Sequence, residues 1–354
     1  MKILIGVCGI GNGHLSRQTN VIDFLLSMGN EIIVATTSNN LRYFEKKFKN
    51  IKVIEIKIPW ISCNSNGIDF EQSLEKYEQS NIDQFKSFLE FSINLQNMGK
   101  NPDIVITDYE PNVAQYSYAA NIPLICMEQQ SKFLYLEDDK IKKFSILEEK
   151  LRINYFFPKY DYKIISSFFP IKIKDRKVKI VTPIITNLKI KTNKKNHILV
   201  YFSPYENSQD YVKLLNNLNN IHNFSIIVYT KENFKSNYSN NIIFKKYSDE
   251  FKNDLENAYC LISTAGHQLL SEAISINIPL YLIPLNTYEQ HYNAKMIEKY
   301  HLGEIAKCKS LNEVKKFISK VPIYSEQMKK FRKKYYKNNW QKCLLGVLND
   351  YKFK

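Results

Sequence analysis

The stretch KILIGVCGIGNGHLSR, residues 2–17, joins an apolar run to three alternating glycines, a histidine and an arginine. The continuous apolar run at 2–8 is typical of a strand that is buried on both faces of a parallel sheet. Residues 15–28 follow with helical spacing, and Gly29 ends this segment. The stretch therefore predicts a strand, a tight glycine loop and a helix, which together are the first unit of an α/β fold.

The rest of the first half repeats this alternation. Strand patterns occur at 31–36, 52–58, 103–108, 123–128 and 161–167. The long polar segment 69–98 has helical spacing, with Phe85, Phe88, Leu89 and Leu95 as its expected apolar face. Alternating strands and helices predict a parallel sheet with helices on both faces.

The second half restarts the same pattern, with strands expected at 197–203, 224–230, 242–245, 259–263 and 279–284. We expect an N-terminal domain at 1–181, a basic linker at 182–196, a C-terminal domain at 197–324 and one basic helix over 325–354. This helix would pack back on the N-terminal domain. The fold class is α/β, with two Rossmann-like parallel-sheet domains facing a cleft, where ligands of such folds bind.

Composition narrows the functional classes. The 354 residues carry a formal net charge of +15, which favours an anionic partner. No cysteine pair has metal or redox spacing, so neither a metal nor a cofactor is expected. The N-terminus does not resemble a signal peptide and no apolar run could span a bilayer, which predicts a cytoplasmic protein. A basic cluster near the C-terminus could hold it at an anionic membrane, at about 1 kcal/mol per charge, through Lys329, Lys330, Arg332, Lys333, Lys334 and Lys337.

The glycine loop at 9–13 suggests either a phosphate cradle or a catalytic histidine. A dinucleotide fingerprint would read GxGxxG, with an acid at the end of the second strand. Here the loop reads GxGxG and the second strand ends in Ala35-Thr36-Thr37, so a dinucleotide is disfavoured. Gly11 and Gly13 are better explained as clearing space for an acceptor.

His14 would lie at the N-terminus of the first helix, where the helix dipole keeps an imidazole neutral and able to accept a proton. Asp108 ends the strand at 103–108 and would reach the same edge of the sheet. A carboxylate there would fix the tautomer of the ring. Asp108 could instead cap the following helix, with Glu110 taking its place beside His14.

In the second half, STAGHQLLSEA at 263–273 follows a strand and opens a helix. Free N–H groups at such a helix start form a pyrophosphate site, here built by Ser263, Thr264, Ala265, Gly266 and His267. Glu272 could accept from ribose hydroxyls. Glu289 and Gln290, which open a later helix, could bind sugar hydroxyls. The alternative, less favoured, is that all of these polar residues are simple helix caps.

These motifs, in this order, resemble those of the GT-B nucleotide-sugar glycosyltransferases over nearly the whole chain. The nearest resemblance is to the branch of the bacterial lipid-intermediate N-acetylglucosaminyltransferase and its teichoic-acid-type relatives. GIGNGHLSR is similar to the glycine-rich loop of the family, and STAGHQLLSEAISINIPLYLIPLNTYEQHYNA to its donor signature. Two departures, Ala265 before Gly266 and Glu289 before Gln290, leave the donor sugar open.

The resemblance implies a role for each residue. Gly266 and His267 would contact the diphosphate, Glu272 the uridine ribose, and Glu289 and Gln290 the transferred sugar. On the acceptor side, His14 would be the base or an acceptor-phosphate contact. Arg17 would face an anionic acceptor group, unless it is simply a surface residue.

The expected reaction is a metal-independent, inverting transfer from a UDP-sugar to a saccharide or a lipid-linked or phosphorylated acceptor, in cell-surface glycan synthesis. One alternative is a UDP-sugar hydrolase of a sialic-acid-like pathway. An alternative of another class is a non-catalytic protein that binds anionic polymers. No nucleic-acid-binding motif is visible.

Overall fold

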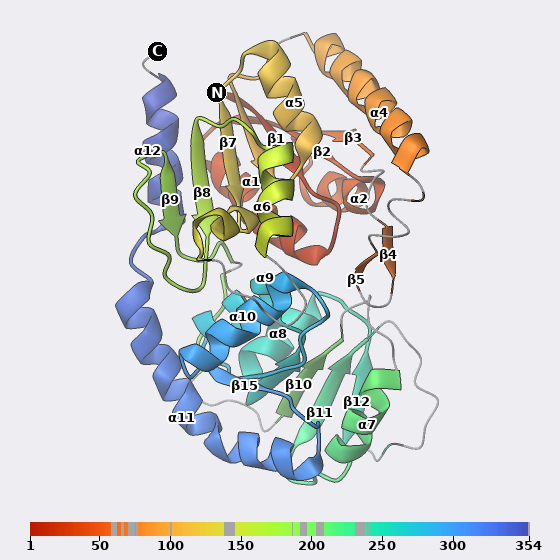
Figure 1. Ribbon diagram of the computed structural model, residues 1–354, viewed down its shortest axis with the longest axis vertical. Coiled ribbons are helices and arrows are strands. Elements are labelled where there is room, and N and C mark those ends of the chain that lie inside the picture. Colours follow the sequence, from red (N-terminus) through yellow and green to blue (C-terminus); the bar gives the residue numbers. More distant parts are fainter. Residues whose placement is uncertain are drawn as a thin grey trace. The chain divides into compact units, whose positions relative to one another are not determined.

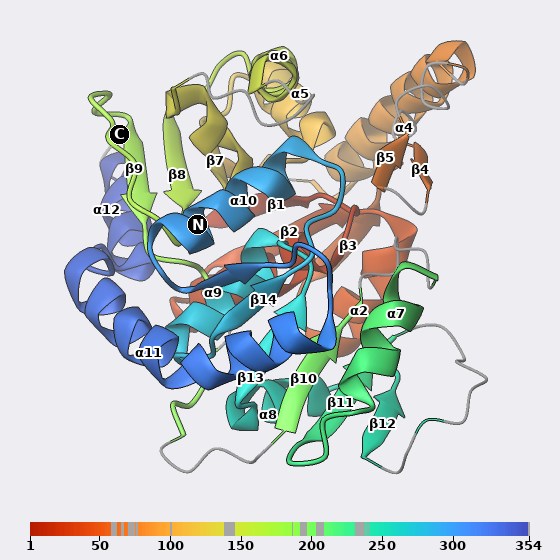
Figure 2. The ribbon, with the colours of Figure 1, turned by 60° about the horizontal axis from the view of Figure 1, so that its bottom comes forward.

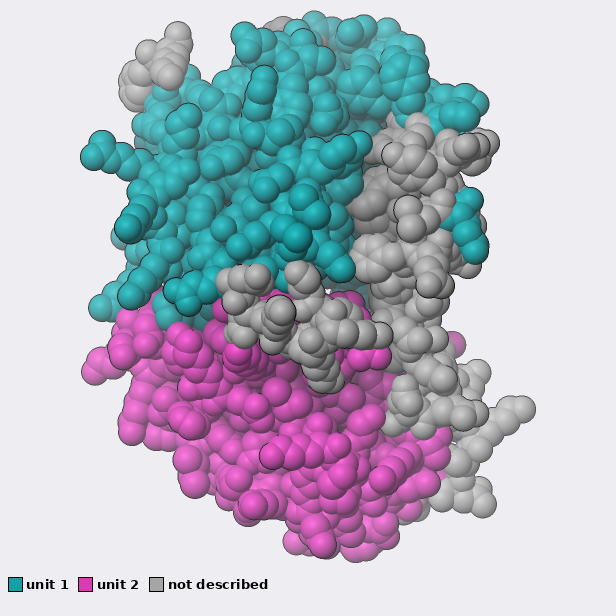
Figure 3. Space-filling view, in the orientation of Figure 1, with its two compact units in different colours: residues 1–62, 70–186, 337–354 teal, residues 63–69, 187–336 magenta. Residues whose placement is uncertain are grey.

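The computed structural model describes two compact units, which are coloured separately in Figure 3. The first unit comprises residues 1–62, 70–186 and 337–354, and the second comprises 63–69 and 187–336. The unit boundary at 186–187 lies inside the expected linker, of which residues 186 and 192–196 are outside the described part of the chain. The described residues are 1–57, 62–64, 67–69, 75, 77–99, 101–137, 146–185, 187–191, 197–202, 209–230, 238 and 241–352.

The first unit is built on a parallel sheet with the strand order β3-β2-β1-β6-β7-β8-β9. All six residues of β1 are buried, as expected for the central strand of a sheet covered on both faces. The strand order reverses at β1, because β2 pairs with one of its edges and β6 with the other. The strands are β1 (Lys2–Val7), β2 (Glu31–Thr36), β3 (Lys52–Glu55), β6 (Ile104–Asp108), β7 (Leu124–Glu128), β8 (Tyr162–Ser166) and β9 (Val178–Val181).

Helices cover both faces of this sheet (Figure 1). On one face, side chains of β1 share an apolar core with α1 and α12. On the other face α5 approaches so closely that a Cβ on Gly6 would lie 2.3 Å from a methyl group of Val113. The helices are α1 (Asn12–Ser27), α2 (Ser38–Lys47), α4 (Tyr77–Asn97), α5 (Pro111–Ala120), α6 (Ile146–Phe156), α12 (Trp340–Lys352) and the short 3₁₀ helix η1 (Gln130–Tyr135).

The expected apolar face of the helix over 69–98 is only partly correct, because Leu95 is buried and Phe88 half-buried, whereas Phe85 and Leu89 face solvent. α4 begins at Tyr77, and Phe85 and Leu89 are 63% and 43% exposed. Among the α4 side chains that the structure describes, Phe91 and Leu95 are buried, together with Ser87, whose hydroxyl accepts a hydrogen bond from the Lys57 amide at 2.8 Å. Apolar residues occur on more than one side of this helix, so helical periodicity did not select the side that packs.

The second unit contains a six-stranded parallel sheet with the order β12-β11-β10-β13-β14-β15. Side chains of α7 and α11 share one apolar core with these strands, and both helices lie at the front of the sheet in Figure 2. The strands are β10 (His197–Tyr201), β11 (Ser225–Tyr229), β12 (Ile242–Lys245), β13 (Cys260–Ser263), β14 (Leu280–Leu282) and β15 (Gly303–Ile305), and the helices are α7 (Gln209–Leu218), α8 (Glu250–Asn257), α9 (His267–Ser275), α10 (Tyr288–Lys299) and α11 (Leu311–Tyr335). A separate two-stranded sheet pairs β4 (Ser62–Asn64) with β5 (Gly67–Asp69).

The expected single C-terminal helix is two helices. α11 ends at Tyr335 in the second unit, and α12 begins at Trp340 in the first. Between them, the Asn338 carbonyl accepts from the Thr182 amide at 2.9 Å and the Asn338 side chain donates to the Ile180 carbonyl at 3.1 Å. These bonds replace the helical ones, so the chain leaves the helical path. Trp340, Leu344, Val347 and Leu348 of α12 complete the core of the first unit.

Candidate active site

The loop between β1 and α1 needs glycine at two positions. Gly11 has φ +76° and precedes α1 without any side-chain cap. A left-handed conformation of this kind disfavours every residue with a Cβ. Gly9 meets Thr37 so closely that an added Cβ would overlap its hydroxyl. The glycines therefore let the loop turn tightly against the end of β2, and α1 starts directly after them.

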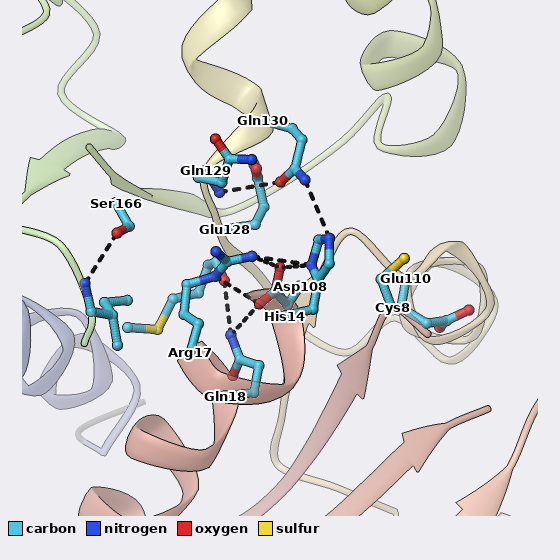
Figure 4. A network of polar contacts seen from close by, with 12 residues as sticks. Cys8, His14, Arg17, Gln18, Asp108, Glu110, Glu128, Gln129, Gln130 and Ser166 are labelled. Carbon is cyan, nitrogen blue, oxygen red and sulfur yellow. Dashed lines mark hydrogen bonds and ion pairs between the residues drawn. The ribbon is translucent and has the colours of Figure 1, made fainter. Parts of the chain in front are cut away.

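His14 and Asp108, which the sequence placed at one sheet edge, lie in contact (Figure 4). His14 Nδ1 is 2.8 Å from Asp108 Oδ1. Asp108 is fully buried at the end of β6, where its backbone is paired with Val7 of β1, and His14 is 8% exposed in the first turn of α1. The carboxyl ends of two neighbouring parallel strands thus bring together residues 94 positions apart in sequence.

The charge of Asp108 fixes the tautomer of His14. Burial alone raises the pKa of the Asp108 carboxyl, but the Arg17 guanidinium and the His14 ring outweigh burial and hold that pKa at about 2. An ionised carboxylate only accepts hydrogen bonds. Arg17 Nη2, which can only donate, also lies 3.0 Å from His14 Nδ1, but the carboxylate is the closer partner at 2.8 Å. We therefore assign the ring proton to Nδ1, which leaves the Nε2 lone pair able to accept a proton.

Gln130 lies next to that lone pair. Its amide nitrogen is 3.3 Å from His14 Nε2, while its carbonyl oxygen accepts from the Gln129 amide at 3.4 Å. The amide nitrogen is therefore the donor toward the ring. Gln130 opens η1, whose first turn is held by hydrogen bonds from the Ser131 amide to the Glu128 carboxylate at 2.9 and 3.1 Å.

The expectation that Arg17 faces an anionic acceptor is wrong, as is the alternative of a surface residue. Arg17 is 1% exposed. Its Nε and Nη2 donate to the two oxygens of Asp108 at 2.8 and 2.7 Å. Bidentate pairs of this geometry are among the strongest charge-assisted contacts. Arg17 is the counter-ion of Asp108, and sequence reasoning missed this because the need for a cation arises only when Asp108 is buried.

Gln18 is a site residue that sequence reasoning missed. Its Nε2 donates to Asp108 Oδ2 at 2.9 Å and to the Met127 carbonyl at 3.1 Å, which ties α1 to the ends of both β6 and β7. A signal was present in the sequence. His14, Arg17 and Gln18 share one helical face, since residues three and four apart on a helix are neighbours.

Glu110 does not substitute for Asp108 at His14. It caps α5, and its carboxylate accepts from the Asn112 and Val113 amides at 3.0 and 2.8 Å and from the Asn112 side chain at 2.9 Å. Tyr109, between the two acids, has φ 55°, which turns the chain sharply. Asp108 is therefore free of the capping role, and burial raises the pKa of Glu110 to about 7 despite its three donors.

In the second unit, the loop between β13 and α9 contains the expected donor-site residues. Gly266 precedes α9 without a side-chain cap, and the space around its Cα is open. Its φ of −66° is allowed for any residue, so neither strain nor crowding demands glycine there. Ser263, Thr264, Ala265 and His267 are all buried. Glu272 is half-buried and accepts from the Gln268 side chain at 3.0 Å.

The residues expected to bind the transferred sugar open α10. Glu289 and Gln290 are half-buried in its first turn. Gln290 Oε1 accepts from the backbone amides of Ala265 and Leu285 at 2.9 and 3.0 Å. In the described part of the chain its amide nitrogen has no hydrogen-bond partner. One half of the Gln290 side chain therefore binds backbone, and only the other half could reach a ligand.

The basic cluster lies at the end of α11 and just after it. Five of its cations are exposed: Lys329, Lys330, Lys333, Lys334 and Lys337. Arg332 departs from the expectation, because it is half-buried and donates to the carbonyl of Ser275, the last residue of α9. Cations are favoured at such a helix C-terminus. Within the described ranges, no helix has both the length and the apolarity that a membrane span requires.

Comparison with known proteins agrees with this architecture. No curated protein matches the chain. Similar solved structures include the calicheamicin glycosyltransferase CalG4, at 13% identity and a TM-score of 0.70 over 99% of this chain and 97% of that one. Arabidopsis thaliana UGT89C1 complexed with UDP-L-rhamnose matches at 13% identity and 0.71, covering 99% and 98%. Acinetobacter baumannii MurG matches at 13% and 0.64, covering 99% of each chain.

At these identities the solved structures show the fold, which is GT-B: two parallel-sheet Rossmann-like domains. A family model assigns the activity. The model described as "Glycosyl transferase family 1" matches residues 1–322, which include both sheets and every candidate residue from His14 to Gln290. The chain therefore belongs to glycosyl transferase family 1.

Proposed function

We propose that this glycosyltransferase moves a sugar from a UDP-sugar to an acceptor hydroxyl, with His14 as the general base. The observation that supports this most directly is the pairing of His14 Nδ1 with the ionised Asp108 carboxylate at 2.8 Å. This pairing presents an unprotonated Nε2 at the carboxyl edge of the sheet, where β1 and β6 meet and where ligands of doubly wound sheets bind.

In the proposed reaction, the acceptor hydroxyl donates its proton to His14 Nε2 while its oxygen attacks the anomeric carbon of the donor. The bond from that carbon to the diphosphate oxygen breaks, and its electron pair leaves with the diphosphate. Asp108 stabilises the imidazolium that forms, and Arg17 keeps Asp108 ionised throughout. A single displacement of this kind inverts the anomeric configuration.

The second unit would hold the donor. We assign the diphosphate to the start of α9 at Gly266 and His267, the ribose to Glu272, and the transferred sugar to Glu289 and the free amide of Gln290. The uncapped helix start and the open space at Gly266 support this, because backbone N–H groups and the helix dipole stabilise a departing anion without a metal. One of the similar structures, Arabidopsis thaliana UGT89C1, was solved with UDP-L-rhamnose.

For the acceptor, we propose a saccharide or a lipid-linked or phosphorylated molecule of cell-surface glycan synthesis. The order of the sequence motifs supports the N-acetylglucosaminyltransferase and teichoic-acid-type branch. The five exposed lysines of the basic cluster suit a peripheral location at the inner, anionic face of a membrane. Flotation with anionic liposomes at physiological salt tests this part by itself, and an absence of binding would exclude it.

The main test measures UDP release with a panel of UDP-sugars and acceptors. We expect His14→Ala to reduce kcat/KM by roughly 10²- to 10⁴-fold, the usual contribution of a general base. Glu272→Ala should weaken donor binding. The matched controls are His222→Ala and Glu326→Ala, whose side chains are exposed in the second unit.

Unchanged turnover in both His14→Ala and Glu272→Ala would refute the assignment. UDP release that is equally fast without any acceptor would instead identify a hydrolase.

A further inference from the structure

Two side chains of α10 bind the backbone N–H and the backbone carbonyl of a single residue, Ala265, in the loop between β13 and α9. The Ala265 N–H donates to Gln290 Oε1 at 2.9 Å, and the Ala265 carbonyl accepts from Asn293 Nδ2 at 2.9 Å. Ala265 and Asn293 are both 0% exposed. Gln290 and Asn293 lie three residues apart, so they project from one face of the helix. We call this pair the Ala265 clamp.

The clamp is itself anchored. Gln290 Oε1 also accepts from the Leu285 amide at 3.0 Å, so one oxygen joins the loop after β13 to the loop after β14. The Thr287 hydroxyl, which caps α10, accepts from the Gln290 backbone amide at 3.3 Å. The side chain that binds Ala265 therefore starts from a fixed helix end. The bond from Asn293 is fully buried and the bond to Gln290 is partly buried, and a polar group left unpaired in such surroundings is costly.

We propose that Gln290 and Asn293 are positioning residues that set the path of the loop 264–266, so that the amides at the start of α9 are pre-arranged for the donor diphosphate. This inference rests on the proposed function, which assigns the diphosphate to that helix start. Ala265 then supports the site and does not contact the ligand, because both of its backbone polar groups are already bound.

The local geometry explains why the loop needs such support. Gly266 follows Ala265 directly, and it has neither a side-chain cap nor any neighbour within 4 Å of its Cβ position. Glycine also has the greatest conformational freedom of any residue. Without the clamp, binding would have to order this segment, and affinity falls when a site is not pre-organised. The clamp supplies that order before the diphosphate arrives.

The test uses the full chain and three variants. Gln290→Met removes the acceptor of the Ala265 N–H at nearly constant volume, and Asn293→Ala removes the donor to the Ala265 carbonyl. The matched control is Asn241→Ala. Asn241 Nδ2 also donates to a backbone carbonyl at 2.9 Å, that of Ile221, where both residues precede their strands at the opposite edge of the same sheet.

The first measurement needs no ligand. Hydrogen exchange of the peptide spanning 263–268 should accelerate in Gln290→Met and Asn293→Ala and stay at the wild-type rate in Asn241→Ala. Unchanged exchange in both clamp variants would overturn the clamp, whatever the enzyme binds.

The second measurement compares the affinities for UDP and UMP. UDP lacks the transferred sugar, so any contact of Gln290 with that sugar does not enter. In both clamp variants we expect UDP binding to weaken roughly tenfold, the effect of one buried hydrogen bond, while UMP binding stays within about twofold. General damage to the unit would weaken both nucleotides equally.

An unchanged ratio of UDP to UMP affinity, despite faster exchange, would overturn the positioning role. If the wild-type protein itself did not prefer UDP to UMP, the proposed donor assignment would fall, and this role of the clamp with it.

Discussion

Replacing Asp108 by asparagine should destabilise the first unit strongly, because it leaves the Arg17 guanidinium buried without its counter-ion. Arg17 is 1% exposed, and both of its bonds to Asp108 are shorter than 3 Å. Removing one partner of a buried ion pair costs about 3–5 kcal/mol. For a unit of this size each kcal/mol lowers Tm by about 2–4 °C. We therefore expect the Tm of Asp108→Asn to fall by roughly 10 °C.

The pKa of Asp108 gives a second estimate. The folded pKa is about 2, against an ordinary value of 3.8. A lowered pKa of an acid stabilises the folded state above pH 3.8, and this contribution is lost as the pH falls through 2. The shift corresponds to roughly 2 kcal/mol at neutral pH. Protonated Asp108 and asparagine both leave the Arg17 guanidinium buried without a counter-ion, so the two estimates together place the loss at about 2–5 kcal/mol.

Tryptophan fluorescence during thermal or urea unfolding is the appropriate assay. Both tryptophans of the chain lie in the sequence of the first unit, and Trp340 is buried in its core. The matched control is Asp161→Asn, where the carboxylate accepts from the Leu124 amide at 2.9 Å, and its cost should stay near 1 kcal/mol.

Adding Arg17→Met to Asp108→Asn removes the stranded charge and should recover part of the lost stability. Equal melting of Asp108→Asn and Asp161→Asn, or no recovery in the double variant, would refute the reasoning.

Three further predictions follow from the first unit. Because burial raises the pKa of Glu110 from 4.5 to about 7, the folded state binds the extra proton and stability should decline by roughly 3 kcal/mol as the pH rises between these values. A plot of the urea midpoint against pH across this range should be less steep for Glu110→Gln than for the wild type. Equal steepness would contradict the raised pKa of Glu110. Gly11→Ala should cost about 1–2 kcal/mol because φ is +76°, whereas Gly346→Ala, within α12 and with open space around it, should be neutral or stabilising; equal effects would argue against strain at Gly11. Gln130→Leu should change KM for the acceptor more than kcat, because the acceptor hydroxyl must take the place of the Gln130 amide at His14 Nε2; a loss confined to kcat would point to a different role.

Much of the architecture could be predicted from local pattern. The apolar run in β1 indicated a central strand because a strand covered on both faces needs apolar residues at every position. The strands expected at 31–36 and 242–245 occur within those bounds. β9 and β15 were missed, because they are short and have charged residues among their apolar ones.

The residues of the candidate site also fall into those whose contacts could be predicted from the sequence and those whose contacts could not. His14 and Asp108 could be paired from the sequence, because each follows or ends a parallel strand and such ends converge on one edge. Helical spacing put Arg17 and Gln18 on the face of His14, but it did not show that both bind Asp108, because Asp108 needs a cation and a donor only once it is buried. No local pattern pointed to the contact of Gln130 with His14. Nothing in the sequence marked Asn293 as a site residue, apart from its place on a predicted helix.

What the sequence determined by itself is most of the order of strands and helices and the residues that follow the predicted strands, because hydrophobic periodicity and glycine turns are local properties. The tertiary structure decided which buried charge meets which partner, which side of α4 packs, and where the last helix breaks. These outcomes depend on desolvation and on long-range contacts. Arg17 shows the difference between the two most clearly. Its position three residues after His14 was compatible with a ligand contact, and only the burial of Asp108 made it a counter-ion.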